Sequence, residues 1–267
     1  MENYGEEREV KTNFRKALSA VLLATFSAVI FIGGCSGSQK KEPEPTPQAL
    51  YENAMNLFQK KKYERAADAF KKFKEEFPLS EYTPLVELRT ADIYFFQKKY
   101  AEAIVLYEEF RKLHPMHPEI SYAVYQMGMC HGNQMLTLDR DQTETEKAIE
   151  QFRYLIENYP KSPQAADGKT RMQVCQKQMA DHEFYIGHFY FRTKKYKAAL
   201  GRFEGLLQKY PESGLEEKIR TLVGTCQLEI AKQEEKRKER EAQEELKKKK
   251  AEEDKKKAKQ TSSDKSG

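Results

Sequence analysis

The stretch KKYERAADAFKKFKEEFPLS (61–80) decides the fold, because its pattern returns 37 residues later as KKYAEAIVLYEEFRKLHPMH (98–117). Each copy places an alanine four residues before an aromatic residue and twelve residues before a proline, as Ala66, Phe70 and Pro78 show for the first. Two further copies occupy 143–162 and 194–213. A fixed period of this length is typical of a repeat protein, in which one structural unit recurs along the chain.

A second apolar segment precedes each copy and has the period of an α-helix. Leu50, Ala54 and Leu57 precede the first copy and share one helix face. A small residue in this helix, followed by the alanine, aromatic residue and proline of the next, forms the tetratricopeptide (TPR) pattern. One helix pair cannot bury its apolar face alone, so such pairs stack. The sequence therefore predicts an all-α fold, a TPR helical solenoid of about four repeats plus a closing helix that contains Gly224.

Two insertions interrupt the pattern. The third copy carries eight extra residues around LTLDRDQTETE (136–146), which predict a polar loop or an extended helix end. Before the fourth copy there are 14 extra residues, which is close to four helical turns and preserves the helix face. We therefore expect one long helix from Pro163 to about Arg192, with Ser162 as its N-cap.

The amino terminus has the composition of an export signal. Lys11, Arg15 and Lys16 precede the apolar run ALSAVLLATFSAVIFIGG (17–34). The ending IGGC resembles a bacterial lipobox, which implies that 1–34 are a lipoprotein signal peptide and that Cys35 receives a covalent lipid carrying acyl chains such as palmitate. By the same resemblance, Ser36 after the cysteine favours the outer membrane. The alternative is an uncleaved signal anchor with an incidental cysteine.

Composition divides the remainder of the chain into three parts. A Pro-rich tether spans 35–47, the TPR solenoid domain spans 48–230, and a charged tail spans 231–267, helical or disordered. Residues 232–260 hold 13 Lys/Arg and 9 Asp/Glu, so they account for most of the net charge of +5. The body is close to neutral, and we expect no basic stripe on it and no nucleic-acid partner.

No catalytic or metal-binding pattern stands out in the sequence. The two histidines of HEFYIGH (182–188) are six residues apart and cannot share a metal on one helix face. Cys130, Cys175 and Cys226 are expected to be small buried apolar residues, with no bridge between the first and the last. Their redox state stays open. We expect the chain to have no enzymatic activity, to bind no metal, and to carry no cofactor apart from the lipid on Cys35.

Four stretches carry a resemblance to a known family: FKEEFPLSEYTPLVELRTADIYF (73–95), KLHPMHPEISYAVYQMGM (112–129), LDRDQTETEKAIEQFRYLIENYPKSP (138–163) and ADHEFYIGHFYFRTKKYKAALGRFEGLLQKYPES (180–213). They resemble the BamD family, the TPR lipoproteins of the outer-membrane β-barrel assembly (BAM) machinery. The RDQT loop (140–143) and the long helix are its more specific marks. The chain departs from the family's pattern at Gln164 and Gly168, and its charged tail replaces a fuller fifth repeat.

The resemblance implies a non-catalytic scaffold, anchored by lipid to the outer membrane and facing the periplasm. Its partners would be the barrel-forming BAM subunit, other BAM lipoproteins and unfolded β-barrel proteins, whose insertion it would assist. By the same resemblance, the barrel-forming subunit would contact Arg202, Arg192 and Tyr196. A substrate groove would hold Tyr82, Tyr94 and Phe96. The alternative is a TPR lipoprotein adaptor for pilus assembly or for cell-wall and division complexes.

Overall fold

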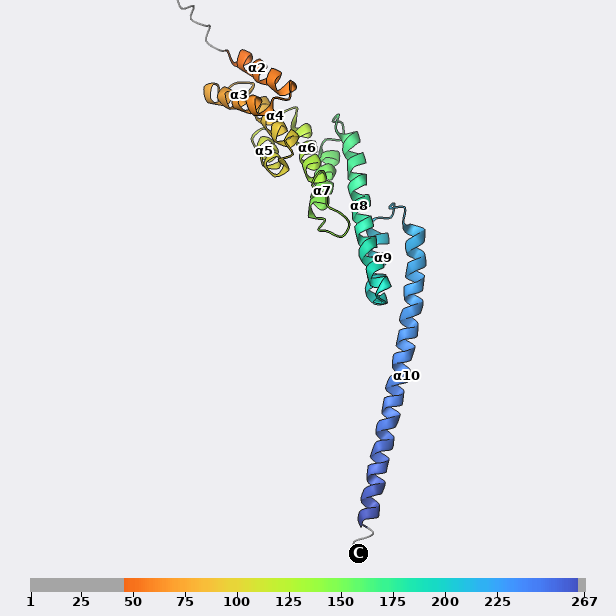
Figure 1. Ribbon diagram of the computed structural model, residues 1–267. Helices are drawn as coiled ribbons and strands as arrows, with labels where there is room; N and C mark the ends of the chain where they lie inside the picture. The colour runs from red at the N-terminus through yellow and green to blue at the C-terminus, as the bar shows by residue number, and fades with distance from the viewer. Residues whose placement is uncertain (1–45, 264–267) are drawn as a thin grey trace, which may run out of the picture. The chain divides into compact units, whose positions relative to one another are not determined.

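The computed structural model describes residues 46–263, with side chains to residue 256, and within that range it contains nine α-helices and no strand (Figure 1). The predicted signal peptide 1–34, Cys35 and all but the end of the predicted tether 35–47 lie outside the described residues. The helices are α2 (Pro47–Gln59), α3 (Tyr63–Glu76), α4 (Thr83–Phe96), α5 (Tyr100–Leu113), α6 (Ile120–Gly132), α7 (Thr143–Asn158), α8 (Ala165–Arg192), α9 (Tyr196–Lys209) and α10 (Glu216–Ser263). Across this part of the chain, none of the helices is both long enough and apolar enough to cross a membrane.

The helices pair in chain order, and each pair packs on the next, as the repeat pattern predicts. The aromatic residue in the second helix of each pair is fully buried; these residues are Phe70, Tyr107, Phe152 and Phe203. A small residue in the first helix makes room for the ring. A Cβ added at Gly128 would lie 2.6 Å from Phe152, and one added at Gly187 would lie 2.7 Å from Phe203. The all-α TPR solenoid is therefore confirmed.

The turns inside three of the pairs place a lysine where glycine is usual. Lys61, Lys98 and Lys194 have φ angles of 56°, 61° and 58°. In the first turn the Lys62 N–H donates to the Leu57 carbonyl at 3.0 Å and the Lys61 N–H donates to the Phe58 carbonyl at 2.8 Å. These two bonds form a Schellman motif, whose left-handed residue is commonly glycine. A side chain in that conformation costs roughly 1–2 kcal/mol, so each of these lysines lowers the stability of the fold relative to glycine.

The two insertions form a loop and a lengthened helix, as expected. Residues 133–142 connect α6 to α7, and α8 has 28 residues where α4 has 14. The predicted N-cap is wrong, because α8 begins after Gln164 and the buried Ser162 hydroxyl has no hydrogen-bond partner among the described residues. Instead, the Ser162 carbonyl accepts the Ala165 N–H at 3.1 Å, so a backbone turn sets the start of the helix.

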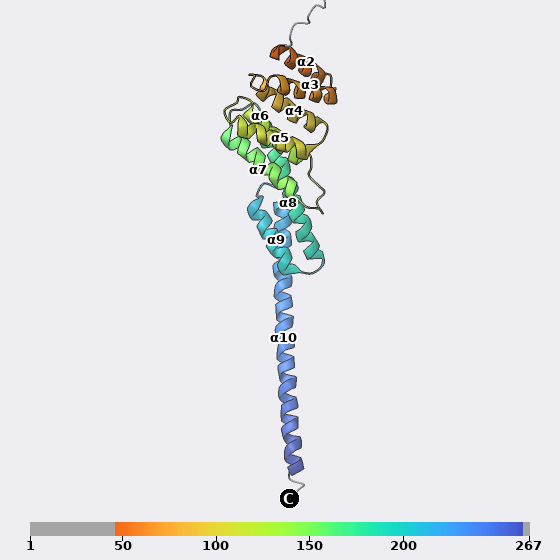
Figure 2. The ribbon, with the colours of Figure 1, turned by 90° about the vertical axis from the view of Figure 1, so that its left-hand side faces the viewer.

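Helix α10 closes the last repeat with its first turns and then continues alone. Ile219 and Cys226 are buried in the cluster that includes Phe203 of α9. A Cβ at Gly224 would meet no atom within 4 Å, because no second helix of a fifth repeat covers that position. Beyond about residue 235 the side chains described are exposed, and Figure 2 shows the helix extending past α9 without a neighbour. The predicted closing helix is confirmed, and the tail continues it to Ser263.

Candidate functional site

A shallow groove of about 530 Å³ lies between α8 and α9 and contains Arg202. Its other lining residues are Glu183 and Tyr190 from α8, with Lys197, Ala198, Gly201, Gly205 and Lys209 from α9. Arg202 Nη1 donates a hydrogen bond to Glu183 Oε2 at 2.9 Å. No atom lies within 4 Å of the positions that a Cβ would take at Gly201 and Gly205, so the floor of the groove is open.

The Arg202 side chain is held in place by its ion pair but remains accessible to a partner. It remains 45% exposed, and the side chain of Glu183 is 21% exposed. An ion pair at this exposure contributes only about 0.2–1 kcal/mol to stability, so a partner could replace it at little cost. Lys197 and Lys209 add positive charge, although Lys197 also pairs with Glu234 at 2.8 Å. The groove therefore suits an acidic side chain on a partner.

The structure separates Arg202 from the two residues expected to act with it. Arg192 is exposed at the last position of α8. The Tyr196 ring packs edge-on against Phe191, with 5.7 Å between ring centroids, and is half-buried in the α8–α9 core. Six residues separate Tyr196 from Arg202, so the two point from different faces of α9. Tyr190 and Lys197 line the groove in their place.

The three aromatic residues predicted to form a substrate groove lie in different surroundings. Tyr82, at the start of α4, stacks on Tyr51 with 5.0 Å between ring centroids. Tyr94 lines a depression of about 630 Å³ between α3 and α5. Phe96, at the end of α4, stacks on Tyr63 with 5.6 Å between ring centroids. The structure thus gives each residue a separate surface.

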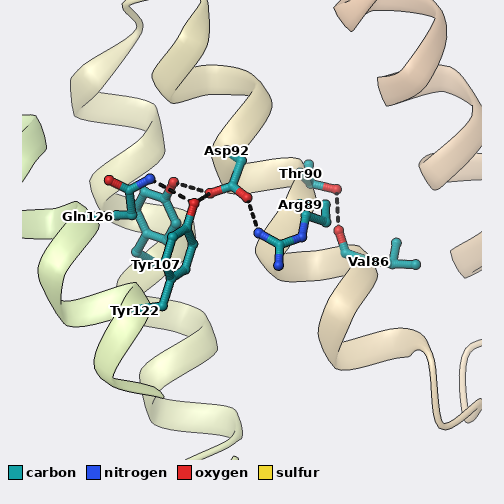
Figure 3. Close-up of polar contacts among 7 residues, drawn as sticks. All are labelled: Val86, Arg89, Thr90, Asp92, Tyr107, Tyr122 and Gln126. Carbon is teal, nitrogen blue, oxygen red and sulfur yellow. Dashed lines mark hydrogen bonds and ion pairs between the residues drawn. The ribbon is translucent and has the colours of Figure 1, made fainter. Parts of the chain in front are cut away.

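A buried polar cluster links three helices across two repeats, and the sequence analysis did not identify it (Figure 3). Asp92 of α4 is 1% exposed. Its Oδ1 accepts hydrogen bonds from the hydroxyls of Tyr107, on α5, and Tyr122, on α6, at 2.6 and 3.0 Å. Its Oδ2 accepts a bond from Arg89 Nη1 at 2.5 Å, and Gln126 Nε2 donates to the Tyr122 hydroxyl at 2.8 Å. Helices α4, α5 and α6 are thereby joined.

Electrostatics mark this cluster as structural. Burial raises the pKa of Asp92, and the Arg89 charge and the three hydrogen bonds oppose that rise. Burial and the neighbouring carboxylate also raise the pKa of Tyr107. A carboxylate this enclosed, with each oxygen already accepting a bond, has no room for a substrate. It holds repeats together and does not act as an acid or base.

The predicted RDQT loop (140–143) is ordered by one buried glutamine. Gln142 Nε2 donates to the carbonyls of Thr137 and Arg140 at 2.9 and 3.2 Å, and its Oε1 accepts the Thr145 hydroxyl at 2.9 Å. From α8, Gln178 Nε2 donates to the Leu136 carbonyl at 2.9 Å. The loop therefore lies against the long helix.

The three cysteines and the histidines of the described residues have structural surroundings. Cys130, Cys175 and Cys226 are free and buried, which confirms the expected burial. Burial raises the pKa of Cys130 to about 12 and that of Cys175 to about 11, so both are protonated and unreactive at neutral pH. His182 Nδ1 bonds the Leu138 carbonyl at 2.7 Å, and His188 stacks on Phe184. Residues 46–256 contain no group of side chains suited to a metal ion.

The sequence is similar to one protein family and to several named proteins. The YfiO family, described as outer membrane lipoprotein, matches residues 43–246. A relative in Rickettsia prowazekii, named outer membrane protein assembly factor BamD, is 31% identical over 73% of this chain and 76% of its own length. The protein of that name in Caulobacter vibrioides is 29% identical over 72% of this chain and 64% of its own. The one in Vibrio cholerae is 27% identical, over 72% and 83%.

Proposed function

The chain belongs to the YfiO family of outer membrane lipoproteins, and from that premise we propose that it is a non-catalytic scaffold of outer-membrane protein assembly that holds the barrel-forming subunit of the machinery. Its relatives are assembly factors, so association with the outer membrane and a part in assembly follow from the family. The contact with the barrel-forming subunit is assigned to the α8–α9 groove.

The state of Arg202 carries this assignment. Its guanidinium is oriented by Glu183 yet is 45% exposed, and it stands above an open floor. A guanidinium held in this way can exchange Glu183 for a partner carboxylate with two parallel hydrogen bonds, which combines orientation with charge. Lys197 and Lys209 extend the positive surface along α9.

The proposal also includes the anchor and the other partners. Cys35 carries the lipid, the tether 35–47 follows it, and the solenoid faces the periplasm. Unfolded β-barrel proteins and other assembly lipoproteins are the further partners. Tyr82 and Tyr94 lie in separate surroundings and serve as separate contact points for unfolded substrates, whereas Phe96 lies at the end of α4 beside Tyr63.

Charge reversal at Arg202 tests the contact. Tagged full-length chain is purified from mildly solubilised outer membranes, and bound proteins are identified by mass. Arg202→Glu should lower recovery of a large β-barrel protein at least tenfold, because a like charge would face the partner's carboxylate. Arg220→Glu, an equal change at an exposed position on α10, should retain that protein.

Two results would count against the proposal. If wild-type chain recovers no large β-barrel protein, the scaffold role fails. Recovery of pilus or division proteins in its place would favour the adaptor alternative. If Arg202→Glu and Arg220→Glu recover equal amounts, the role stands but the α8–α9 groove is the wrong surface.

A further inference from the structure

The turn between α2 and α3 lies beside the turn between α4 and α5, at one edge of the first two repeats. Phe96, which ends α4, stacks on Tyr63 at an interplanar angle of 5° and also contacts Phe58, with 5.9 Å between ring centroids. Lys61, Lys62 and Arg65 line a hollow together with Gln97 of the neighbouring turn. The two turns therefore present one continuous surface.

This surface, which we call the lysine edge, consists of Phe96 and six exposed basic residues: Lys60, Lys61, Lys62, Arg65, Lys98 and Lys99. Two acidic residues, Glu64 and Glu102, lie in the first turns of the helices that follow. Six positive charges against two negative ones leave a local excess of four. The near-neutral charge of the whole body conceals this local excess.

The backbone at the lysine edge favours a different residue. Lys61 and Lys98 both occupy the left-handed position of a Schellman motif, where glycine is free of strain. Lys194 in the fourth repeat shares this conformation, so it belongs to the turn of the repeat and glycine is compatible with the backbone at all three positions. At the lysine edge, the side chain at two of these positions is a cation that projects from the end of a helix pair.

The apolar content of the lysine edge selects the kind of partner. Phe96 is 47% exposed at the junction of the two turns. An exposed ring among lysines, whose stems lie along apolar surface while the ammonium groups reach water, is typical of contact with a membrane interface. Eleven residues, 36–46, separate Cys35 from α2. At full extension they reach about 40 Å, so an anchor at Cys35 keeps the first repeats close to the bilayer.

We infer that the lysine edge docks on anionic lipid headgroups of the leaflet that holds the Cys35 lipid. The inference rests on the lipid anchor of the proposed function. The six cations would bind headgroup phosphates, and the Phe96 ring would enter the interfacial layer beside the lysine stems. The anchored solenoid would then lie with this edge on the membrane, leaving the α8–α9 groove for a protein partner.

The chain contains no tryptophan, so a single substitution supplies a fluorescent reporter. Phe96→Trp places the reporter in the lysine edge, at the last residue of α4. Leu79→Trp places a control reporter at a 98% exposed site that precedes the first residue of α4. The lipidated full chain is reconstituted into vesicles of phosphatidylcholine with or without phosphatidylglycerol, and brominated acyl chains act as quenchers. Flotation of the vesicles reports the anchor, while quenching reports the docked edge.

The turn geometry supplies matched charge variants that do not threaten the fold. Lys61→Gly with Lys98→Gly removes two cations and relieves two left-handed side chains, so the melting temperature should rise. Lys194→Gly makes the same change in the fourth repeat, away from the edge. Each lysine near an anionic leaflet contributes about a fivefold factor, so the double variant should lower the ratio of docked to undocked chain about 30-fold. Lys194→Gly should leave that ratio unchanged.

The inference is supported if anionic vesicles quench the Phe96→Trp reporter and do not quench the Leu79→Trp control. Salt at 0.5 M, which has a screening length of about 4 Å, should relieve this quenching. Equal quenching of both reporters, or equal docking of the double variant and Lys194→Gly, overturns it. A chain that floats with vesicles but shows no quenching keeps its anchor and loses the docking surface. A chain that does not float refutes the anchor itself, and with it the basis of the inference.

Discussion

Replacing Gly187 by alanine should destabilise the solenoid, whereas the same change at the equivalent Gly224 should stabilise it. At Gly187 the new Cβ would lie 2.7 Å from Phe203 Cε1. Carbon atoms pack at about 3.5–4.0 Å, so the fully buried ring must shift by about 1 Å in a closed core. Overpacking of this kind costs about 1–3 kcal/mol, and alanine returns up to about 1 kcal/mol in helix propensity. We expect a net loss of up to about 2 kcal/mol.

Gly224 stands 37 residues after Gly187, at the same position of the repeat. A Cβ there meets nothing within 4 Å, so only the helix-propensity term of up to about 1 kcal/mol remains, and its sign is favourable. Urea denaturation followed by circular dichroism measures both changes, with Gly201→Ala as a second open-site control. If Gly187→Ala stabilises the chain as Gly224→Ala does, the close approach of α8 to α9 is not a constraint and the argument fails.

Three further predictions concern polar contacts. Asp92→Ala should lower the free energy of unfolding at pH 7 by about 1–3 kcal/mol, since Arg89 and two tyrosine hydroxyls lose their hydrogen-bond acceptor in a buried site. Because burial raises the folded pKa of Asp92 above 3.8, acidification through that raised value adds stability in the wild type and not in the variant; a variant that keeps this gain would contradict the assignment. The Tyr125 hydroxyl lowers the pKa of Asp167 in the folded state. The Asp167 carboxylate therefore contributes to the free energy of unfolding above pH 3.8, and this contribution is lost as the pH falls through the lower folded pKa. The same titrations should show no such loss in Asp167→Asn. His182→Ala removes the bond to the Leu138 carbonyl, so trypsin should cut after Arg140 several-fold faster, whereas His188→Ala should leave the rate unchanged.

The regular part of the fold could be predicted because small and aromatic residues recur along the sequence at a fixed spacing. An aromatic ring from the second helix fits only where the first helix carries a small residue, as Phe203 and Gly187 show. That requirement recurs at fixed spacing and is visible without an alignment. The length of α8 was predictable for a related reason, since 14 inserted residues keep the helix in phase.

The candidate site could not be predicted to the same degree, because it depends on which face of a helix a residue takes. Arg192, Tyr196 and Arg202 are close in sequence, yet only Arg202 faces the groove. Tyr82 and Phe96 are on one helix but stand at its two ends. Asp92 was overlooked because a single acidic residue beside Ala91 has no repeated spacing. Its role depends on two tyrosines, 15 and 30 residues away, that only the fold brings to it.

The two insertions were predicted separately, but the structure makes them one unit. The loop 133–142 adds backbone carbonyls that a regular repeat lacks, and α8 adds helix turns that no regular neighbour would cover. The Leu136 and Leu138 carbonyls accept bonds from Gln178 and His182 of α8, at 2.9 and 2.7 Å. Each insertion therefore satisfies polar groups of the other. Removing either one alone would leave those groups without their partners, so we expect the loop and the long helix to be lost or retained together.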